Sequence, residues 1–212
     1  MCQTQTCYKC IGWQTFALLT GPEMLAFIDR ILSLGAKMNR LELCREMFKV
    51  SHLTGEFKLR SGQISNEYFD KYRFEAQPVL LKNIALQMKD LIPKGTEVLA
   101  GLEMGGIPIA TALSLETGIP AAFVRKQAKS YGTCQLAEGT DIKAKKVCII
   151  EDVITTGGQV IESTQQLREF DAQVDTVLCA IYRGQGKPEK LQNIGLTVKP
   201  LFTMEELKAS EN

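Results

Sequence analysis

The chain has 212 residues, with 25 Lys and Arg against 24 Asp and Glu, which gives a net charge of +1. This length can bury one good core, so we expect a single domain with a small appended lobe. The near-neutral charge argues against general electrostatic binding of nucleic acid or anionic membranes, and no apolar stretch reaches the length of a transmembrane helix.

The N-terminal part of the chain is predicted to be an extension that chemistry does not need. Residues 1–20 show no sustained periodicity, and a helix start follows at Gly21-Pro22-Glu23, where proline suits the first turn. Met38 offers an alternative translation start. We therefore divide the chain into an extension, residues 1–37, and a main domain, residues 38–212.

The seven cysteines predict free thiols in a reducing cytoplasm. Cys148 and Cys179 stand inside apolar runs and read as small core residues. The start of the chain lacks the basic segment of a secretion signal. Cys7 and Cys10 form half of a zinc site at best, because the only histidine, His52, is distant.

Beyond Met38 a helix is expected over residues 39–50, followed by a hairpin over residues 57–70 with a Ser-Gly turn. Helical and extended segments then alternate, which predicts a parallel sheet with helices on both faces and ligands at the carboxyl ends of the strands. The expected strands cover residues 98–100, 121–124, 147–150 and 174–182, and the expected helices cover residues 80–91, 107–115 and 160–167.

Glycines and cations follow the first two of these strands. Gly105-Gly106 allows close backbone approach after the strand at 98–100, and three cations, Arg125, Lys126 and Lys129, follow the strand at 121–124. The cations open a long polar loop that reaches about residue 144, and they suit a lid that closes over a polyanion. Taken alone, a Gly-Gly turn and a solvated basic loop are ordinary surface features.

The most informative stretch covers residues 147–159, Val-Cys-Ile-Ile-Glu-Asp-Val-Ile-Thr-Thr-Gly-Gly-Gln. An apolar run typical of a buried parallel strand ends in two carboxylates, Glu151 and Asp152, which suit hydroxyl groups. The turn at residues 155–158 can expose consecutive backbone N–H groups at the start of a helix, where anions bind favourably. Together they predict a ligand with a sugar diol and a phosphate. The alternative, an ordinary strand–turn–helix junction without a ligand, explains the pattern less well.

This pattern resembles the phosphoribosyl pyrophosphate (PRPP) motif of type I phosphoribosyltransferases. Four other segments resemble motifs of the orotate-specific members of that family, in the right order, and the resemblance spans roughly residues 41–207. These segments are the hood segment S-G-x-x-S-x-x-Y-x-D at 61–70, the pyrophosphate loop at 101–108, the catalytic loop R-K-x-x-K-x-(H/Y)-G at 125–132, and a D-R-x-x-G-like motif at 182–186.

The resemblance implies an α/β fold with a central parallel sheet and a small hood lobe. The hood covers mainly residues 38–75 with part of 184–212, and the core covers about 76–183. The implied reaction transfers ribose 5-phosphate from PRPP to orotate in UMP biosynthesis, giving orotidine 5-monophosphate and pyrophosphate. Mg²⁺ is expected to bind through PRPP, with no direct protein ligand. A homodimer is implied, in which the catalytic loop reaches the neighbouring subunit's site.

The resemblance also assigns roles to individual residues. The implied catalytic residues are Lys129, Arg125, Lys126 and Asp152. The implied PRPP-binding residues are Glu151, Asp152, Val153, Ile154, Thr155, Thr156, Gly157, Gly158, Gln159, Arg125, Lys126, Lys129, Tyr131, Glu103, Gly105 and Gly106. The implied orotate-binding residues are Arg183, Thr155, Arg60, Tyr68 and Phe69.

Three positions depart from the family pattern. Gly105 stands where many orotate-specific relatives carry lysine, Tyr131 where bacterial members often carry histidine, and Tyr182 where aspartate is usual. The pyrophosphate loop is therefore expected to bind through backbone N–H groups.

Two alternatives stay open at this point. One is a purine-base phosphoribosyltransferase on the same fold, although such relatives generally lack the Arg-Lys-x-x-Lys loop and the Ser-Gly hood. The other is a PRPP-binding transcriptional regulator, which needs a basic DNA-binding module. Residues 1–37 offer only three cations against two acids. We also expect no decarboxylase domain in this chain, so that a separate protein performs the next step to UMP.

Overall fold

The computed structural model describes residues 37–58, 62–126 and 136–211. In this part of the chain, six strands form one sheet in the order β5-β4-β3-β6-β7-β8. All neighbours in it run parallel except the β4–β5 pair. The strands are β3 (Val98–Leu102), β4 (Ala121–Val124), β5 (Ala137–Gly139), β6 (Lys146–Ile154), β7 (Gln173–Tyr182) and β8 (Thr197–Thr203).

The strand order reverses between β3 and β6. From β3 the chain moves outward to β4, whereas from β6 it moves in the opposite direction to β7 and β8. The loops that leave the carboxyl ends of β3 and β6 therefore run in opposite directions, and ligands bind at such switch points in open α/β sheets. The expected α/β architecture is confirmed.

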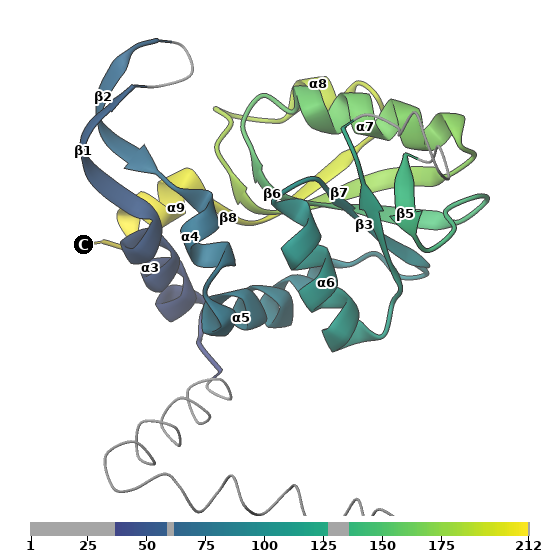
Figure 1. The fold of residues 1–212 in the computed structure, drawn as a ribbon, viewed down its shortest axis with the longest axis horizontal. Helices are drawn as coiled ribbons and strands as arrows, with labels where there is room; N and C mark the ends of the chain where they lie inside the picture. The colour runs from purple at the N-terminus through teal and green to yellow at the C-terminus, as the bar shows by residue number, and fades with distance from the viewer. Residues whose placement is uncertain (1–36, 59–61, 127–135, 212) are drawn as a thin grey trace, which may run out of the picture. The chain divides into compact units, whose positions relative to one another are not determined.

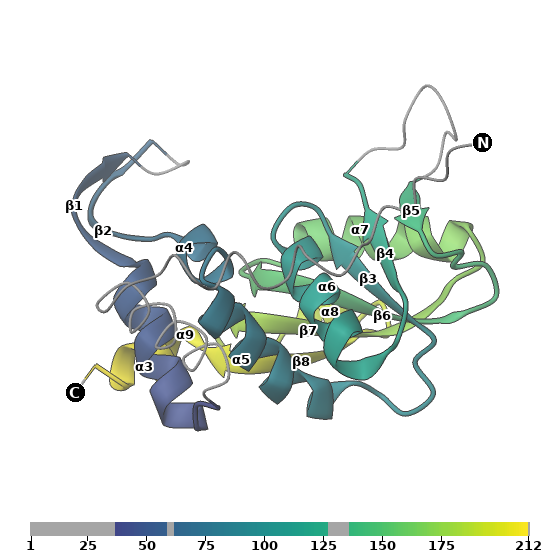
Figure 2. The same cartoon turned by 60° about the horizontal axis from the view of Figure 1, so that its bottom comes forward.

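Helices cover both faces of the sheet (Figures 1 and 2). Successive residues of β6 point to opposite faces, so that Cys148 and Ile150 pack with one core cluster and Ile149 with the other. The first cluster contains apolar residues of α3 (Arg40–Ser51), α5 (Pro78–Met88) and α6 (Gly106–Thr117). The second contains those of α7 (Gly158–Glu169) and α8 (Glu189–Gln192).

An antiparallel hairpin stands apart from the large sheet. Its strands are β1 (His52–Lys58) and β2 (Ile64–Phe69), and it rises beside α3 and the C-terminal helix α9 (Met204–Ala209) (Figure 1). α3 begins in a capping box, in which the Asn39 side chain accepts from the Glu42 N–H and Glu42 bonds back to the Asn39 N–H. The short α4 (Lys71–Glu75) leads from the hairpin towards α5, and the 3-10 turn η2 (Lys89–Leu91) follows α5.

The elements expected from residue 39 onward are present, with differences at their ends, whereas the helix start expected at Gly21-Pro22-Glu23 lies outside the described residues. β6 runs on through the acidic pair to Ile154, because β7 pairs with it as far as Tyr182; the expectation that the strand ends before the carboxylates is wrong. β5, β8, α4 and α8 were not assigned from the sequence. β5 interrupts the expected polar loop because it pairs antiparallel with β4.

The buried cysteines agree with the sequence analysis. Cys44, Cys148 and Cys179 are free thiols in the core, and burial raises the pKa of Cys148 to about 12. Over the described residues, no helix is both long enough and apolar enough to cross a membrane.

Candidate active site

The acidic pair lies at the end of β6, beneath the surface. Glu151 is almost fully buried and Asp152 is fully buried, although both were expected to meet a ligand directly. The Asp152 carboxylate is held in place by the backbone, because its Oδ1 accepts from the Val153 N–H at 2.5 Å. Above it, Lys71 of α4 places its Nζ 2.5 Å from Asp152 Oδ2. Lys71 was not singled out from the sequence.

Three titratable side chains, those of Lys71, Glu75 and Glu151, surround the Asp152 carboxylate. Burial and the hydrogen bond to Asp152 raise the pKa of Glu75 to about 9, and the same causes raise the pKa of Glu151 well above its usual range. Burial alone would raise the pKa of Asp152, but hydrogen bonds from the two acids and from Lys71 outweigh it and lower that pKa. The pKa values of Glu75 and Glu151 are thus shifted upward and that of Asp152 downward, so that Asp152 is the acid of the three that ionises most readily.

The turn after β6 is open to a ligand. Thr155, Thr156, Gly158 and Gln159 are exposed, and α7 begins at Gly158 with no side chain capping its N-terminal N–H groups. Gly157 adopts a left-handed conformation, φ 75°, and a Cβ there would lie 2.9 Å from Leu191 Cδ1. The expected exposure of backbone N–H groups at a helix start is therefore present in the geometry.

The turn after β3 packs tightly on β6. A Cβ at Gly105 would overlap the Asp152 carboxylate, and a Cβ at Gly106 would overlap the Ile150 carbonyl oxygen. The Glu103–Met104 peptide bond that precedes them is cis. The two glycines were interpreted as allowing close approach of a ligand, and the structure adds that they allow close approach of β6 itself.

The described part of the basic loop is its base. The Arg125 N–H donates to the Leu136 carbonyl at 2.9 Å, which brings the two ends of the loop together beside the β4–β5 pair. Arg125 Nε lies 3.9 Å from Glu138 Oε1, and Lys126 is exposed. Lys129 and Tyr131 lie outside the described residues.

A second pocket lies between the hairpin and the end of β7. It has a volume of about 310 Å³. It brings together Tyr68, Phe69 and Arg183, which were predicted to bind a base. The Arg183 N–H donates to the Ile154 carbonyl at 2.8 Å, so the residue is fixed next to the end of β6. The complete lining is Phe48, His52, Ser65, Glu67, Tyr68, Phe69, Arg183, Met204 and Lys208.

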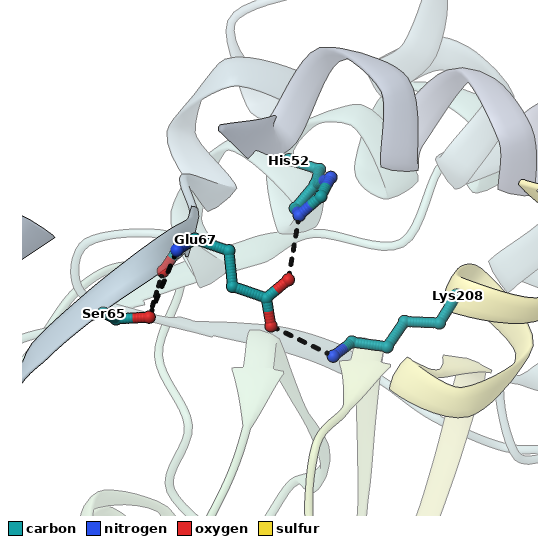
Figure 3. Close-up of polar contacts among 4 residues, drawn as sticks. All are labelled: His52, Ser65, Glu67 and Lys208. Carbon is teal, nitrogen blue, oxygen red and sulfur yellow. Dashed lines mark hydrogen bonds and ion pairs between the residues drawn. The ribbon is translucent and has the colours of Figure 1, made fainter. Parts of the chain in front are cut away.

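Polar contacts join the two walls of this base pocket. Glu67 of β2 accepts from Lys208 of α9 at 3.3 Å and lies 3.0 Å from His52 Nε2, while Ser65 Oγ donates to the Glu67 carbonyl at 2.7 Å (Figure 3). Hydrogen bonds from His52 and Lys208 lower the pKa of Glu67. Sequence reasoning did not find this group, because its members come from elements far apart in the chain.

The remaining predicted residues do not line the base pocket. Thr155 borders a different pocket of about 250 Å³ with Tyr182 and Gly184, not the pocket of Tyr68 and Arg183. A Cβ at Gly184 would overlap the Tyr182 ring, so the tyrosine and the glycine that follows it fit together. Glu103 precedes the Gly-Gly turn, and Arg60 lies outside the described residues.

Comparison with known proteins assigns the class first. The model of the phosphoribosyl transferase domain matches residues 73–201, which include β3, β6 and both turns described above. An orotate phosphoribosyltransferase of Nocardioides sp. is 53% identical over 168 residues, which are 79% of this chain and 94% of that protein. The orotate phosphoribosyltransferase of Methanocella arvoryzae is 42% identical over 153 residues, or 72% and 87% of the two chains.

Solved structures agree with the sequence relatives. The Mycobacterium tuberculosis orotate phosphoribosyltransferase in complex with Fe(III) dicitrate superposes with a TM-score of 0.73 at 28% identity, covering 79% of this chain and 98% of that one. The same enzyme in complex with PRPP superposes with a TM-score of 0.69 at 26% identity, covering 80% and 98%. The chain belongs to the orotate phosphoribosyltransferases, within the type I phosphoribosyltransferase family.

Proposed function

We propose that this chain transfers ribose 5-phosphate from PRPP to N1 of orotate, with the phosphates bound at the ends of β3 and β6 and the base bound in the pocket below the hairpin. The products are orotidine 5-monophosphate and pyrophosphate, so the reaction belongs to pyrimidine synthesis. One observation carries the proposal. The Gly-Gly turn and the acidic pair meet at the point where the strand order reverses, directly beside an uncapped helix start.

The 5-phosphate suits the turn at residues 155–159. Exposed backbone N–H groups at the start of a helix donate to an anion without the cost of ordering long side chains. The two hydroxyls of Thr155 and Thr156 add donors of the same kind. The acidic pair beneath this turn suits the ribose diol, with Glu151 the more accessible of the two carboxyl groups.

The chemistry needs positioning and charge stabilisation rather than a covalent intermediate. The attacked carbon passes through a state that resembles an oxocarbenium ion, while negative charge develops on the leaving pyrophosphate. Fixed cations near that charge lower the barrier electrostatically. Arg125 and Lys126 stand at the base of the basic loop, and Lys129 follows in the sequence as the strongest candidate for this role.

Mg²⁺ belongs to the proposal as an ion that arrives on PRPP. No group of three or more potential ligands is found among the residues that the structure describes, whereas the oxygen donors of Glu151 and Asp152 are the type that Mg²⁺ prefers. These carboxyl groups would hold the ion through the ribose oxygens or through water. When bound, the ion neutralises charge on the pyrophosphate.

The base pocket suits orotate by charge and shape. Arg183 can donate two parallel hydrogen bonds to the carboxylate of the base, and Tyr68 offers an aromatic face. The Tyr68 ring is itself stacked on Phe57 of the paired strand β1, with the centroids 5.5 Å apart, and this contact supports it. The hood, mainly residues 38–75 with part of 184–212, would then hold the base together with Arg183, and the rest of the core, about residues 76–183, would hold the phosphates.

A homodimer is the remaining part of the proposal, with the loop after Arg125 reaching the neighbouring site. A complementation experiment tests it. Lys129→Ala removes the loop cation and Glu151→Gln changes the acidic motif, so each variant alone should lose most activity. Mixed and re-equilibrated, they should regain activity, because one site of each hybrid dimer combines an intact motif with an intact loop. A mixture that stays as inactive as its parts would reject the exchange.

The cytoplasm is the proposed location, because three buried cysteines are unpaired thiols. Residues 1–37 are proposed to be dispensable. A protein that starts at Met38 should therefore retain the full chain's kcat, and its complete loss of activity would overturn this point.

The experiment that tests the proposed function follows orotate by its ultraviolet absorbance. The full chain is given orotate, PRPP and Mg²⁺, and each component is then omitted in turn. Loss of orotate absorbance that requires PRPP and Mg²⁺ supports the proposal. If the chain does not consume orotate but consumes a purine base under the same conditions, the proposed specificity for orotate is wrong and the chain is specific for a purine base.

A further inference from the structure

Lys71 connects the hairpin side of the molecule to the acidic pair. It is the first residue of α4, which follows β2, and its Nζ lies 2.5 Å from Asp152 Oδ2 on β6. The Asp152 side chain is fully buried, whereas 33% of the Lys71 side chain is exposed. The ammonium therefore lies against the buried carboxylate and is itself partly open to solvent.

The adjacent turn lacks a cation. Residues 103–108 read Glu-Met-Gly-Gly-Ile-Pro, which contains one acid and no lysine or arginine. A side chain cannot be added at Gly105, because its Cβ would overlap the same Asp152 carboxylate that Lys71 contacts. A phosphate-rich ligand at this turn would thus meet a buried negative charge unless a cation stands between them.

Lys71 has both the charge and the free donors for that position. Burial alone would lower its pKa, but the hydrogen bond and the attraction to Asp152, with a further contribution from Glu151, outweigh burial and raise the pKa. The ammonium carries three N–H donors, and one carboxylate oxygen occupies one of them. The remaining donors are available on the exposed side.

We propose that Lys71 is a substrate-binding cation that bridges Asp152 and the pyrophosphate group of PRPP, supplied by α4 because the turn after β3 carries no cation and has no room for a side chain at Gly105. This inference rests on the proposed function. Since α4 directly follows the hairpin, the same contact would link phosphate occupancy to the position of Tyr68 and Phe69, which are the last residues of β2 before it.

The test compares Lys71→Gln with Lys71→Arg. Glutamine keeps a hydrogen-bond donor for Asp152 but removes the charge, so the fold should survive. The loss of one charged hydrogen bond is worth about 1.5–3 kcal/mol, so the KM for PRPP should rise about 10- to 100-fold. The KM for orotate should change less than about 3-fold, and arginine should restore most of the PRPP affinity.

A matched control removes a lysine–carboxylate pair elsewhere. Lys145 Nζ lies 3.0 Å from Glu97 Oε1 near the amino end of β6, at the opposite end of the strand from the acidic pair. Lys145→Met should leave the KM for PRPP unchanged. Melting temperatures of all variants separate binding from folding, because a purely structural Lys71 would lower the melting temperature without raising the KM.

Calorimetric titration of the full chain with Mg²⁺ and inorganic pyrophosphate makes the result independent of the base. Weaker pyrophosphate binding by Lys71→Gln than by Lys145→Met supports the inference even if the wild type fails to consume orotate, an outcome that would reject only the proposed function. Equal pyrophosphate affinities in the wild type and Lys71→Gln would overturn the inference.

Discussion

The two halves of the proposed site are built by opposite means. The phosphate wall, residues 103–106 and 151–159, consists of strand ends and turns packed against each other, so that a single methyl group at Gly105 would overlap Asp152. The base wall, the pocket lined by Tyr68, Glu67, Arg183 and Lys208, is held by polar contacts between exposed side chains. Close packing therefore fixes the positions of the residues in the phosphate wall. The residues of the base wall are held by charges that solvent screens.

This comparison implies that the loop cation Lys129 makes the largest single contribution to kcat. Neither wall supplies a charge that acts only in the transition state. Lys129→Ala should lower kcat about 100- to 1,000-fold, with a much smaller change in the KM for PRPP. Steady-state kinetics at saturating Mg²⁺ measure both. Equal losses in kcat and in PRPP affinity would show that Lys129 binds the ground state instead, and the loop would then belong with the phosphate wall.

Gly105→Ala tests the intolerance of the phosphate wall. The added methyl group must displace the Asp152 carboxylate or the turn, which should cost about 1–3 kcal/mol of stability and lower kcat/KM for PRPP about 100-fold. Thermal melting and kinetics measure the two effects.

Gly158→Ala is the matched control for stability. A Cβ at that position would lie 4.0 Å from Thr156 Oγ1, so there is room for it, and its melting temperature should equal or exceed that of the wild type. Similar melting temperatures for both alanine variants would contradict the overlap inferred at Gly105.

Arg183→Met tests the strongest charge of the base wall. Loss of a charge-assisted pair should raise the KM for orotate about 10- to 100-fold and leave the KM for PRPP nearly unchanged. Lys94→Met removes an exposed cation that precedes the amino end of β3, away from both walls, as a control and should change neither constant. A larger increase in the KM for PRPP than in the KM for orotate would show that Arg183 belongs to the phosphate wall.

The phosphate wall was accessible from the sequence because its parts are contiguous. The acidic pair, the Thr-Thr-Gly-Gly turn and the helix start form a single run, and the alternation of elements predicted that the turn after β3 would lie beside it. The sequence could not show that β6 continues through Asp152, because the extra pairing depends on where β7 ends.

The base wall and the cluster around Asp152 were less accessible for a related reason. Glu67 and Lys208 are 141 positions apart, and Lys71 and Asp152 are also distant, so no local pattern joins them. The Asp70-Lys71 pair that follows the hood segment was the available signal for Lys71, but a lysine at the start of a short helix is usually a solvated surface residue. Only the fold reveals the carboxylate beneath it.

The pH dependence of stability tests the packing around Asp152, because Glu75 is part of it. Its folded-state pKa of about 9 lies above its ordinary value of 4.5, so the folded chain binds more protons than the unfolded chain between these values. Stability from this group is therefore present below about pH 4.5 and is lost as the pH rises towards 9. Glu75→Gln fixes the neutral form and should remove this loss.

Melting temperatures at pH 6 and pH 9 measure the effect. The wild type should lose more stability over this interval than Glu75→Gln, by up to about 4 kcal/mol, since each pH unit between the two pKa values contributes about 1.4 kcal/mol. About 1 kcal/mol corresponds to about 2–4 °C in a chain of this size, so the melting temperatures should diverge by up to roughly 10 °C. Glu46→Gln, an exposed acid on α3, is the control and should follow the wild type. Parallel curves for wild type and Glu75→Gln would mean that Glu75 is ionised in the folded state.

Glu67→Gln should have the smallest effect of all, and that small size is the sharpest test of the base wall. Hydrogen bonds from His52 and Lys208 hold the pKa of Glu67 low, so the wild-type residue is ionised at neutral pH. Both partners are polar and accessible, so stability should change by no more than about 0.5 kcal/mol. Because one negative charge leaves a pocket that receives an anionic base, the KM for orotate should fall slightly, by less than about 5-fold.

This gain in orotate affinity should shrink at 0.5 M salt, since screening weakens interactions between charges at the surface but hardly affects a packed wall. A large loss of stability, or a salt-independent change in KM, would show that the Glu67 contacts are packed like those of Asp152, and the contrast between the two walls would not hold.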